Sequence, residues 1–272
     1  MHPTEPPLSA EADDVALAHA VERNTAELLL RMGDAGGGHR RRDDEVSWTL
    51  GGSPLDYHNA VVAAQLVDPS VDAVIMESRE RLRRARVPGT WHVGPSMRPD
   101  DLPARLARAG FDPDGQEPGM AARLDHIPVQ PTTGLDVQVV REVGDLEEWI
   151  SAMGSGFGEG LREAEWVGEM FLRIGLDRPD LRHLLVRRDG RAVGTATVLI
   201  AAGVGGLYFV MTVPDVRRQG IGAEITRAAM RLVRDAGMNH AVLTSSAMGR
   251  SLYQSIGFRQ VCTIRLFTWR PG

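Results

Sequence analysis

A glycine-rich segment at 217–223 holds the residues whose types and spacing best suit binding a reactive ligand. It reads Arg-Arg-Gln-Gly-Ile-Gly-Ala, follows an apolar run over 207–213, and leads into a helical pattern that begins near Gly220. The first N–H groups of a helix lack intrahelical partners and favour an anion. Gly220 and Gly222 let the backbone approach such an anion closely, and the two arginines add positive charge. The segment indicates a site for a phosphorylated ligand, although a Gly-x-Gly pair alone is a weak signal in a chain with 30 glycines.

A second pattern lies downstream of this segment. Residues 239–244 are typical of a short strand, 246–255 of a helix and 261–269 of a final strand. The junction of the last two, 252–258, reads Leu-Tyr-Gln-Ser-Ile-Gly-Phe. A glycine-rich turn and a tyrosine-bearing helix therefore follow two successive strands.

These two segments, in this order, resemble the GNAT superfamily of acyl-CoA-dependent N-acyltransferases. The first is similar to its pyrophosphate-binding motif, Arg/Gln-x-x-Gly-x-Gly/Ala, and the second to its Leu-Tyr-x-x-x-Gly-Phe segment. The resemblance covers about 136–269, where the patterns run strand, helix, helix, strand, strand, strand, helix, strand, helix, strand. It implies an α+β fold (α/β three-layer) in which helices flank a mixed twisted sheet.

The N-terminal half shows a weaker copy of the same frame. Its last patterns are a helix around 101–109, Gly110-Phe111 and a strand at 120–124, which is the ending of the C-terminal half. Placing Gly110-Phe111 on Gly257-Phe258 puts Leu106 on Tyr253. Earlier patterns predict strands at 46–50, 59–67 and 90–93, and a strand end followed by a helix over 71–85.

The copy is degenerate, because no Arg-x-x-Gly-x-Gly precedes its helix and leucine cannot donate a proton. We therefore predict two GNAT-like domains: a degenerate one over 1–128, a linker over 129–135 and a catalytic one over 136–272. The first domain is expected to complete a shared sheet or interface and to wall the acceptor pocket, without binding CoA well.

Composition excludes several classes of protein. The chain of 272 residues, 43% hydrophobic, suits one large or two modest domains and contains no apolar run long enough for a membrane span. Its N-terminus lacks the features of a secretory signal, and a single cysteine, Cys262, allows no internal disulfide, so a cytoplasmic location is expected. A formal net charge of −5 argues against nucleic-acid binding. The basic cluster at 39–42 is followed by acidic residues and is expected to be a solvated loop.

The resemblance implies acetyl-CoA as the co-substrate, and no metal. Its pyrophosphate would lie on the N–H groups of 218–223, and its pantetheine amides would pair with the preceding strand, where an N–H near Met211 would bond the thioester oxygen. Ser246 stands where the family often has an asparagine near CoA. The implied cofactor-binding residues are Met211, Thr212, Val213, Arg218, Gln219, Gly220, Ile221, Gly222, Ala223 and Ser246.

The resemblance also makes Tyr253 the catalytic acid that protonates the leaving thiolate; the alternative is a core aromatic whose hydroxyl bonds a carbonyl. The general base stays unassigned, because the strand over 207–213 contains no acid. Glu159, Glu163 and Glu165 are expected to be solvated helix residues. The loop at 154–160 contains four glycines and is either a mobile lid, with Phe157 as its apolar contact, or a plain linker.

The expected function is an N-acetyltransferase that transfers an acetyl group from acetyl-CoA to a primary amine of a small molecule by direct attack. The alternative is a non-catalytic acyl-CoA-binding sensor or scaffold. A dinucleotide-binding oxidoreductase is disfavoured, since the glycines lack Gly-x-Gly-x-x-Gly spacing. No nucleic-acid or membrane partner is expected, and the protein is expected to be a monomer or homodimer.

Overall fold

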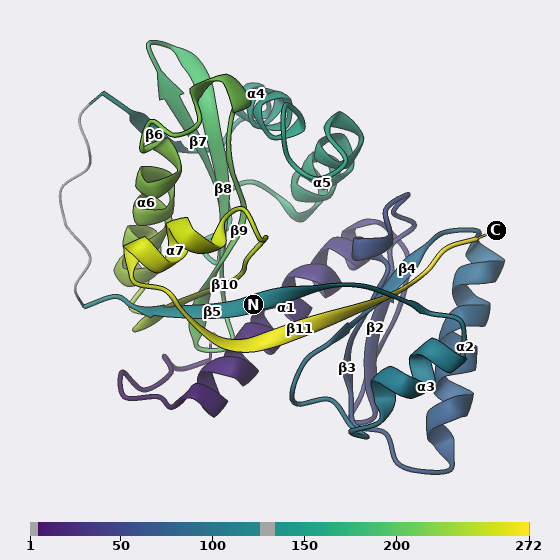
Figure 1. The fold of residues 1–272 in the computed structure, drawn as a ribbon. Coiled ribbons are helices and arrows are strands. Elements are labelled where there is room, and N and C mark those ends of the chain that lie inside the picture. Colours follow the sequence, from purple (N-terminus) through teal and green to yellow (C-terminus); the bar gives the residue numbers. More distant parts are fainter. Residues whose placement is uncertain (1–4, 126–133, 272) are drawn as a thin grey trace.

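The two halves of the chain share one mixed sheet in the computed structural model, which describes residues 5–125 and 134–271 (Figure 1). The sheet order within these residues is β1-β2-β3-β4-β11-β5-β10-β9-β8-β7-β6. The strands are β1 (His39–Arg42), β2 (Val46–Leu50), β3 (Ala60–Ala64), β4 (Gly89–Val93), β5 (Asp112–Arg123), β6 (Asp136–Val139), β7 (Leu181–Arg188), β8 (Arg191–Ala201), β9 (Val204–Thr212), β10 (His240–Thr244) and β11 (Arg259–Trp269).

The last strands of the two halves change places at the centre of this sheet. β11, from the second half, pairs antiparallel with β4 of the first half, and β5, from the first half, pairs antiparallel with β10 of the second. β5 and β11 also pair with each other along most of their length. Figure 1 shows the two strands, teal and yellow, crossing the middle of the molecule side by side. Neither half therefore has a complete sheet of its own.

Helices cover both faces of the sheet. One face carries α1 (Asp14–Ala35), α4 (Val143–Gly154) and α5 (Leu161–Ile174), and the other carries α2 (Ser70–Ala85), α3 (Leu102–Arg108), α6 (Ile221–Asp235) and α7 (Arg250–Ile256). Two short 3-10 turns, η1 (Asp56–His58) and η2 (Pro214–Val216), follow β2 and β9. The predicted α+β fold, a mixed sheet flanked by helices, is confirmed, and the sheets of the two GNAT-like domains are joined into one.

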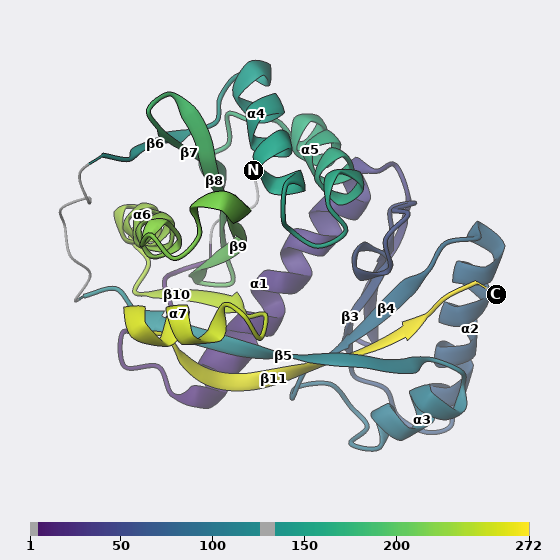
Figure 2. The same cartoon turned by 45° about the horizontal axis from the view of Figure 1, so that its top comes forward.

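Helix α1 ties the two halves together. Its N-cap, Asp13, accepts a hydrogen bond from the Ala16 N–H at 2.8 Å. Its buried side chains are spread around much of the helix, and it contacts strands of both halves as well as α5. Figure 2 shows it running behind the sheet past the place where β5 and β11 meet.

Close packing fixes α6 on the strands that precede the site. A Cβ at Gly205 would lie 2.2 Å from Val233 Cγ1, and one at Gly194 would lie 2.2 Å from Ile225 Cδ1. The missing side chains on β8 and β9 let the helix approach the sheet, so the start of α6 is held against the end of β9.

Some local predictions were wrong. Residues 39–42 form the edge strand β1, because their backbone pairs with β2 while the arginine side chains stay largely in solvent. Residues 71–85 are helical throughout, and α7 begins at Arg250 rather than at 246. The predicted linker, 129–135, lies outside the described residues except for Gly134 and Leu135. Among the described residues, no helix has both the length and the apolar character that crossing a membrane would need.

Candidate active site

A gap between two parallel strands marks the candidate site. β9 pairs with β10 only where Gly205 and Gly206 lie opposite Ala241 and Val242. Beyond that step β9 continues to Thr212, paired with β8 on one side only. The edge of β9 that faces β10 is therefore open along its carboxyl-terminal part.

The alternation of backbone groups shows which residues face this gap. The Val213 N–H donates to the Val193 carbonyl at 3.0 Å, so Val213, and Met211 two residues before it, direct their backbone groups towards β8. Thr212 points the other way, and its carbonyl accepts a hydrogen bond from Arg217 Nε at 3.1 Å. The open edge therefore presents the backbone of Thr212, whereas that of Met211 lies on the paired edge.

A bulge in β9 lies beside the gap. The register with β8 shifts between Thr195 and Thr197, and Phe209 takes a φ of 50°. The Thr195 hydroxyl donates to the Phe209 carbonyl at 2.9 Å, which holds the bulge in place. A non-glycine residue in this region costs about 1–3 kcal/mol, and bulges of this kind redirect backbone groups next to active sites.

The glycine-rich turn over 217–223, here called the cradle, leaves a row of backbone N–H groups free at the start of α6. Gly220, with a φ of 80°, is the N-cap of α6 and has no side chain to cover the helix end. The first N–H of this helix with a backbone acceptor is that of Glu224, which bonds the Gly220 carbonyl at 3.1 Å. Within the described residues, the N–H groups of 218–223 have no acceptor. A row of free donors at a helix N-terminus is what an anion requires.

The side chains of the cradle fall into two kinds. Arg218 is exposed, takes a φ of 62°, and pairs with no acidic group of the described chain. Gln219 is also exposed, but its Oε1 accepts a hydrogen bond from Arg188 Nη1 at 2.6 Å. Arg218 is thus the cation left available to a phosphate, while Gln219 fixes the turn to the β7–β8 hairpin.

Close approach at Gly222 brings three elements of the site together. A Cβ on Gly222 would lie 3.2 Å from Leu252 Cδ2 on α7 and 3.3 Å from Thr212 Oγ1 on β9. The open edge of β9, the start of α6 and the helix that carries Tyr253 therefore meet at one point.

Tyr253, the residue after Leu252 on α7, is buried. It is 9% exposed, and burial raises the pKa of its hydroxyl to about 12. Its ring packs edge-on against Phe258 at 5.8 Å. Within the described residues the hydroxyl forms no hydrogen bond, so it is not held by a core carbonyl and stays protonated at neutral pH.

Ser246 has a local role. Its hydroxyl accepts a hydrogen bond from the Gly249 N–H at 3.2 Å and so closes the turn that precedes α7. The side chain is exposed, which leaves its second lone pair and its proton available to a ligand.

Comparison with known proteins identifies this part of the chain. Residues 146–258, which hold the gap, the cradle and Tyr253, match the model of the acetyltransferase (GNAT) family. This part of the chain is a GNAT domain. A protein of Bacillus subtilis (strain 168), named provisionally as an acetyltransferase, is 29% identical over 80 residues, which are 29% of this chain and about half (54%) of that relative's length.

Solved structures share the fold of the whole chain. A GCN5-related N-acetyltransferase from Kribbella flavida has a TM-score of 0.64 at 19% identity, covering 91% of this chain and 96% of that one. A tandem GNAT protein from the clavulanic acid biosynthesis pathway has a TM-score of 0.59 at 14% identity, with 98% of both chains covered. Both solved proteins thus have the fold of nearly the whole chain.

The loop over 154–160 in the GNAT domain is braced in this structure. Arg217 Nη2 donates to the Gly156 carbonyl at 3.0 Å, while its Nε holds Thr212, so one guanidinium joins the loop to the end of β9. Phe157 packs against Phe209 at the bulge, with ring centroids 5.7 Å apart. The loop therefore contacts the site through its apolar residue, as expected for Phe157.

Glu163 is not the solvated residue that the sequence predicts. It is 9% exposed, and its Oε2 accepts a hydrogen bond from the Glu159 N–H at 3.0 Å. Its Oε1 lies 3.5 Å from Nε2 of His58, a residue of the N-terminal half that is only 2% exposed. The ring of Trp166, also on α5, lies over His58 at 4.6 Å. Burial favours the neutral carboxyl, but the contacts with His58 and the loop outweigh it and lower the pKa of Glu163.

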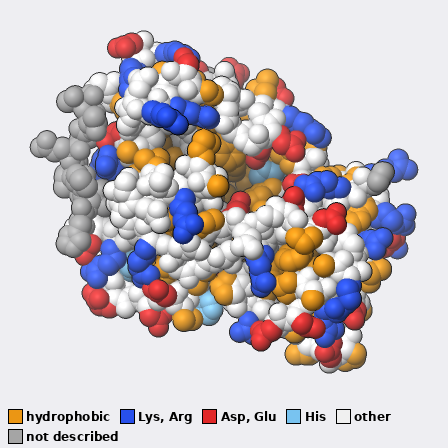
Figure 3. Space-filling view, in the orientation of Figure 1, with side chains coloured by type: hydrophobic (Ala, Val, Ile, Leu, Met, Phe, Trp, Pro, Cys, Tyr) orange, Lys and Arg blue, Asp and Glu red, His pale blue; other side chains and the backbone are white. Residues whose placement is uncertain are grey.

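Residues of the N-terminal half thus reach the GNAT domain, and sequence reasoning assigned them no role. Figure 3 shows a hollow between the two halves, with hydrophobic side chains on its walls and a histidine in its depth. From η1, Tyr57 and His58 enter this boundary, and from β5 comes Glu117, whose Oε2 accepts a hydrogen bond from the Tyr57 hydroxyl at 3.1 Å. Nothing in the local sequence around 57 or 117 signals such a contact, because it depends on the exchange of strands.

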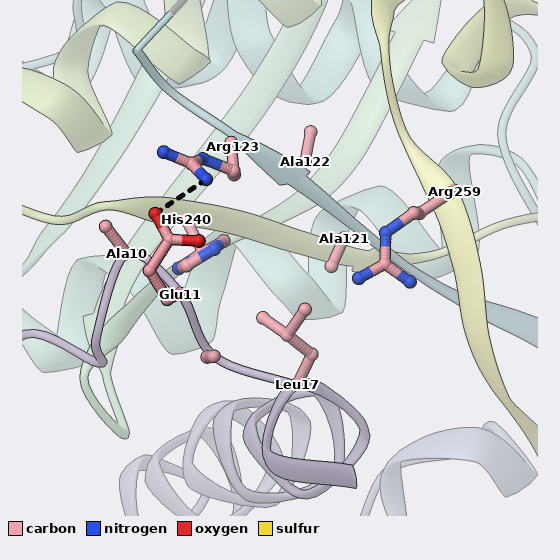
Figure 4. A pocket seen from close by; sticks show the side chains of 9 residues that line it. Ala10, Glu11, Leu17, Ala121, Ala122, Arg123, His240 and Arg259 are labelled. Atoms are coloured by element: carbon pink, nitrogen blue, oxygen red, sulfur yellow. Dashed lines mark hydrogen bonds and ion pairs between the residues drawn. The ribbon is translucent and has the colours of Figure 1, made fainter. Parts of the chain in front are cut away.

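A separate cavity of about 220 Å³ lies at the start of β10 (Figure 4). Arg123 of β5, His240 of β10 and Arg259 of β11 line it, and Arg123 forms an ion pair with Glu11 at 3.1 Å. His240 is the first residue of β10, whereas the cradle follows the last residue of the parallel strand β9. This cavity is therefore not part of the candidate active site.

Proposed function

We propose that the chain is an N-acetyltransferase that moves an acetyl group from acetyl-CoA to a primary amine of a small molecule. The observation that carries this proposal is the row of N–H groups at 218–223 without acceptors. They lie at the end of an open strand edge and next to the helix that carries a buried, protonated tyrosine.

The residues present fit acetyl-CoA. The N–H groups of 218–223 and the exposed Arg218 would hold the pyrophosphate, since free donors and a cation meet there. The open edge of β9 at Thr212 would pair with the amide groups of the pantetheine arm. When bound, acetyl-CoA would supply the thioester carbon that an amine attacks.

The chain's own groups can meet two needs of the transfer. A backbone N–H on the open edge of β9 can stabilise the negative charge that develops on the thioester oxygen, and a preorganised donor of this kind contributes about 3 kcal/mol. Tyr253 can give its proton to the departing thiolate, because burial keeps the hydroxyl protonated while no described group competes for it. General acid catalysis of this type accelerates a reaction by about 10²–10⁴-fold.

Thermal unfolding with and without acetyl-CoA tests the proposal. Acetyl-CoA at 100 times its Kd should stabilise the protein by about 2.7 kcal/mol. S-acetylpantetheine, which lacks the pyrophosphate, should stabilise it much less at the same concentration and serves as the control. Acetyl-CoA should then release thiol in the presence of amines such as spermidine, tyramine or glucosamine. If no CoA species stabilised the protein, the proposal would be contradicted. Binding of acetyl-CoA without thiol release would favour a non-catalytic acyl-CoA sensor.

A further inference from the structure

Four polar residues gather at the closed end of the gap between β9 and β10. The last paired step joins Gly206 to Val242. Tyr208 and Thr244 lie two residues further along β9 and β10, where the two strands are no longer paired. Both side chains point to the face that α1 covers, where the Tyr208 hydroxyl donates to Asn24 at 2.6 Å. Tyr57 lies near both, since the Thr244 hydroxyl and the charge of Tyr208 each affect the pKa of the Tyr57 hydroxyl.

Glu117 is the fourth member of this group, and it comes from the other half of the chain. On β5, the carbonyl of the next residue, Pro118, accepts a hydrogen bond from the Ser245 N–H at 2.9 Å, directly after β10 ends. This places Glu117 beside Thr244, at the closed end of the gap. The Tyr57 hydroxyl donates to its Oε2 at 3.1 Å and so orients the carboxylate.

The Glu117 carboxylate lacks a cation. The chain has 31 arginines, and most acidic side chains near the surface pair with one, but no arginine or histidine lies within ion-pair distance of Glu117 in the described chain. Burial raises the pKa of Glu117, and the nearby Thr244 and Tyr57 hydroxyls only partly offset that effect. A half-buried carboxylate held by hydroxyls is a favourable counter-ion for a ligand with a positive charge.

We propose that the N-terminal half supplies the acceptor site of the GNAT domain: the ammonium group of the acceptor binds against Glu117, beside Tyr57 and Tyr208, and Glu117 takes its proton. This rests on the proposed function and deepens it. The acceptor class is a small amine that is protonated at neutral pH and reaches the gap from the boundary between the halves. The degenerate half would then be part of the catalytic machinery, because its strand β5 pairs with β10 of the other half and carries Glu117.

The protons and bonds of this step balance. Glu117 takes one proton from the ammonium, and the free amine forms the C–N bond as the C–S bond of the thioester breaks. Tyr253 gives its proton to the sulfur, and the second proton lost by the nitrogen returns to Tyr253 through solvent. Glu117 then releases its proton to water, so that one amide, one thiol and one proton are formed.

The pH dependence follows from the groups around Glu117. The titratable groups that face it are Tyr57 from η1 and Tyr208, beyond Tyr57, from β9; β10 and β11 contribute Thr244 and Ile264. Both tyrosines have a pKa raised by burial, so Glu117 is the group of this set that titrates on the acidic side. The rate should fall as pH drops through its raised pKa, because a protonated carboxyl cannot accept a proton.

Comparison of Glu117→Gln with Glu22→Gln tests the proposal. Glu22 is the matched control, a buried carboxylate on α1 that accepts hydrogen bonds from Ser96 and whose pKa is also raised by burial. With the amine that reacts fastest in the panel above, Glu117→Gln should lower kcat/KM by about 10²–10⁴-fold, remove the acidic limb of the pH profile, and leave the Kd of acetyl-CoA within about two-fold. Glu22→Gln should keep the wild-type rate and profile.

Tyr57→Phe is a second, milder variant. The Tyr57 hydroxyl lowers the pKa of Glu117, so its loss should move the acidic limb to higher pH rather than abolish it. Wild-type rates and profiles in both variants would overturn the assignment of Glu117 while leaving the acetyltransferase intact. Acetyl-CoA binding without thiol release from any amine of the panel would overturn the acceptor class. Absence of acetyl-CoA binding in the wild type would instead refute the proposed function.

Discussion

The same strand–helix corner occurs twice in the chain, and only one copy is open to a ligand. β9 leads into α6 and runs parallel to β10, just as β3 leads into α2 and runs parallel to β4. Beyond the last paired step, β9 has a free edge. β3 does not: the Arg98 N–H donates to the Ala64 carbonyl at 2.9 Å, and the Leu66 N–H donates to the Arg98 carbonyl at 3.2 Å. The chain itself occupies the place that a pantetheine arm would take.

The helix starts differ in the same sense. α6 begins after Gly220, with free N–H groups and with Arg218, which has no acidic partner among the described residues. α2 instead begins after Pro69, next to Asp68 and Asp72. Both aspartates pair with Arg105, at 2.9 and 3.4 Å. Carboxylates and a bound arginine thus fill the second corner, where the first leaves room for a phosphate.

The helix ends, by contrast, remain alike. The Phe111 N–H donates to the Leu106 carbonyl at 3.0 Å, and the Phe258 N–H donates to the Tyr253 carbonyl at 3.0 Å. In both cases a glycine with positive φ, Gly110 or Gly257, precedes the phenylalanine. The first half thus has the same helix end as the second, but it lacks the open strand edge and the free N–H groups at the helix start.

The largest effect should come from separating the halves. A fragment of residues 131–272 should be insoluble, because β10 loses β5 and β11 loses both β4 and β5. β11 cannot simply replace β5, since it runs parallel to β10 and β5 runs antiparallel to it. Exposed sheet edges of this kind aggregate. Co-expression with residues 1–130 should restore solubility, and a soluble, active fragment alone would show that the halves are independent.

The next largest effect should come from Tyr253→Phe, compared with the equivalent position in the first half. Loss of the hydroxyl should lower kcat by about 10²–10⁴-fold with little change in the Kd of acetyl-CoA. Leu106, fully buried in the core of the N-terminal half, is the control, and Leu106→Met should keep kcat and cost less than about 1.5 kcal/mol of stability. Steady-state thiol release gives kcat and calorimetry gives the Kd of acetyl-CoA for both variants. An unchanged kcat in Tyr253→Phe would show that Tyr253 is not the general acid.

A smaller effect is expected at the two helix starts. Arg218→Ala should weaken acetyl-CoA binding about five-fold, since an exposed cation on a phosphate contributes less than a buried one. Arg105→Ala should leave the Kd of acetyl-CoA unchanged, because the Arg105 guanidinium forms ion pairs with Asp68 and Asp72. Weaker binding in Arg105→Ala would mean that the N-terminal corner also holds CoA.

Local patterns predicted the frame of the GNAT domain well. The glycine turn and the Gly257-Phe258 helix end are short-range features, and each lies where the sequence puts it. Such features depend on backbone conformations that only a few residues favour. The alignment of Leu106 with Tyr253 also depends on a local helix end, and the structure shows the same hydrogen bonds at both.

What the sequence could not show depends on long-range pairing. The sequence pattern does not predict helix α1, because the helix is buried against both halves and has no single apolar stripe. The exchange of β5 and β11 is invisible locally, since each reads as an ordinary last strand. For the same reason the sequence predicts a solvated Glu163 and gives no role to Glu117. Their partners, His58 and Tyr57, come from a distant part of the chain.

The smallest effect should come from the two helix-ending glycines. Gly110 and Gly257 have φ values of 84° and 112°, and alanine in this region is less stable by roughly 1–2 kcal/mol. Gly110→Ala and Gly257→Ala should therefore lower the free energy of unfolding by similar amounts in denaturant titrations. Only Gly257→Ala should also lower kcat, because its helix end positions Tyr253 through the Phe258 hydrogen bond, whereas that of Gly110 positions Leu106. Equal losses of kcat in both variants would mean that the two ends act on the site alike, and the division between a catalytic and a supporting copy would fail.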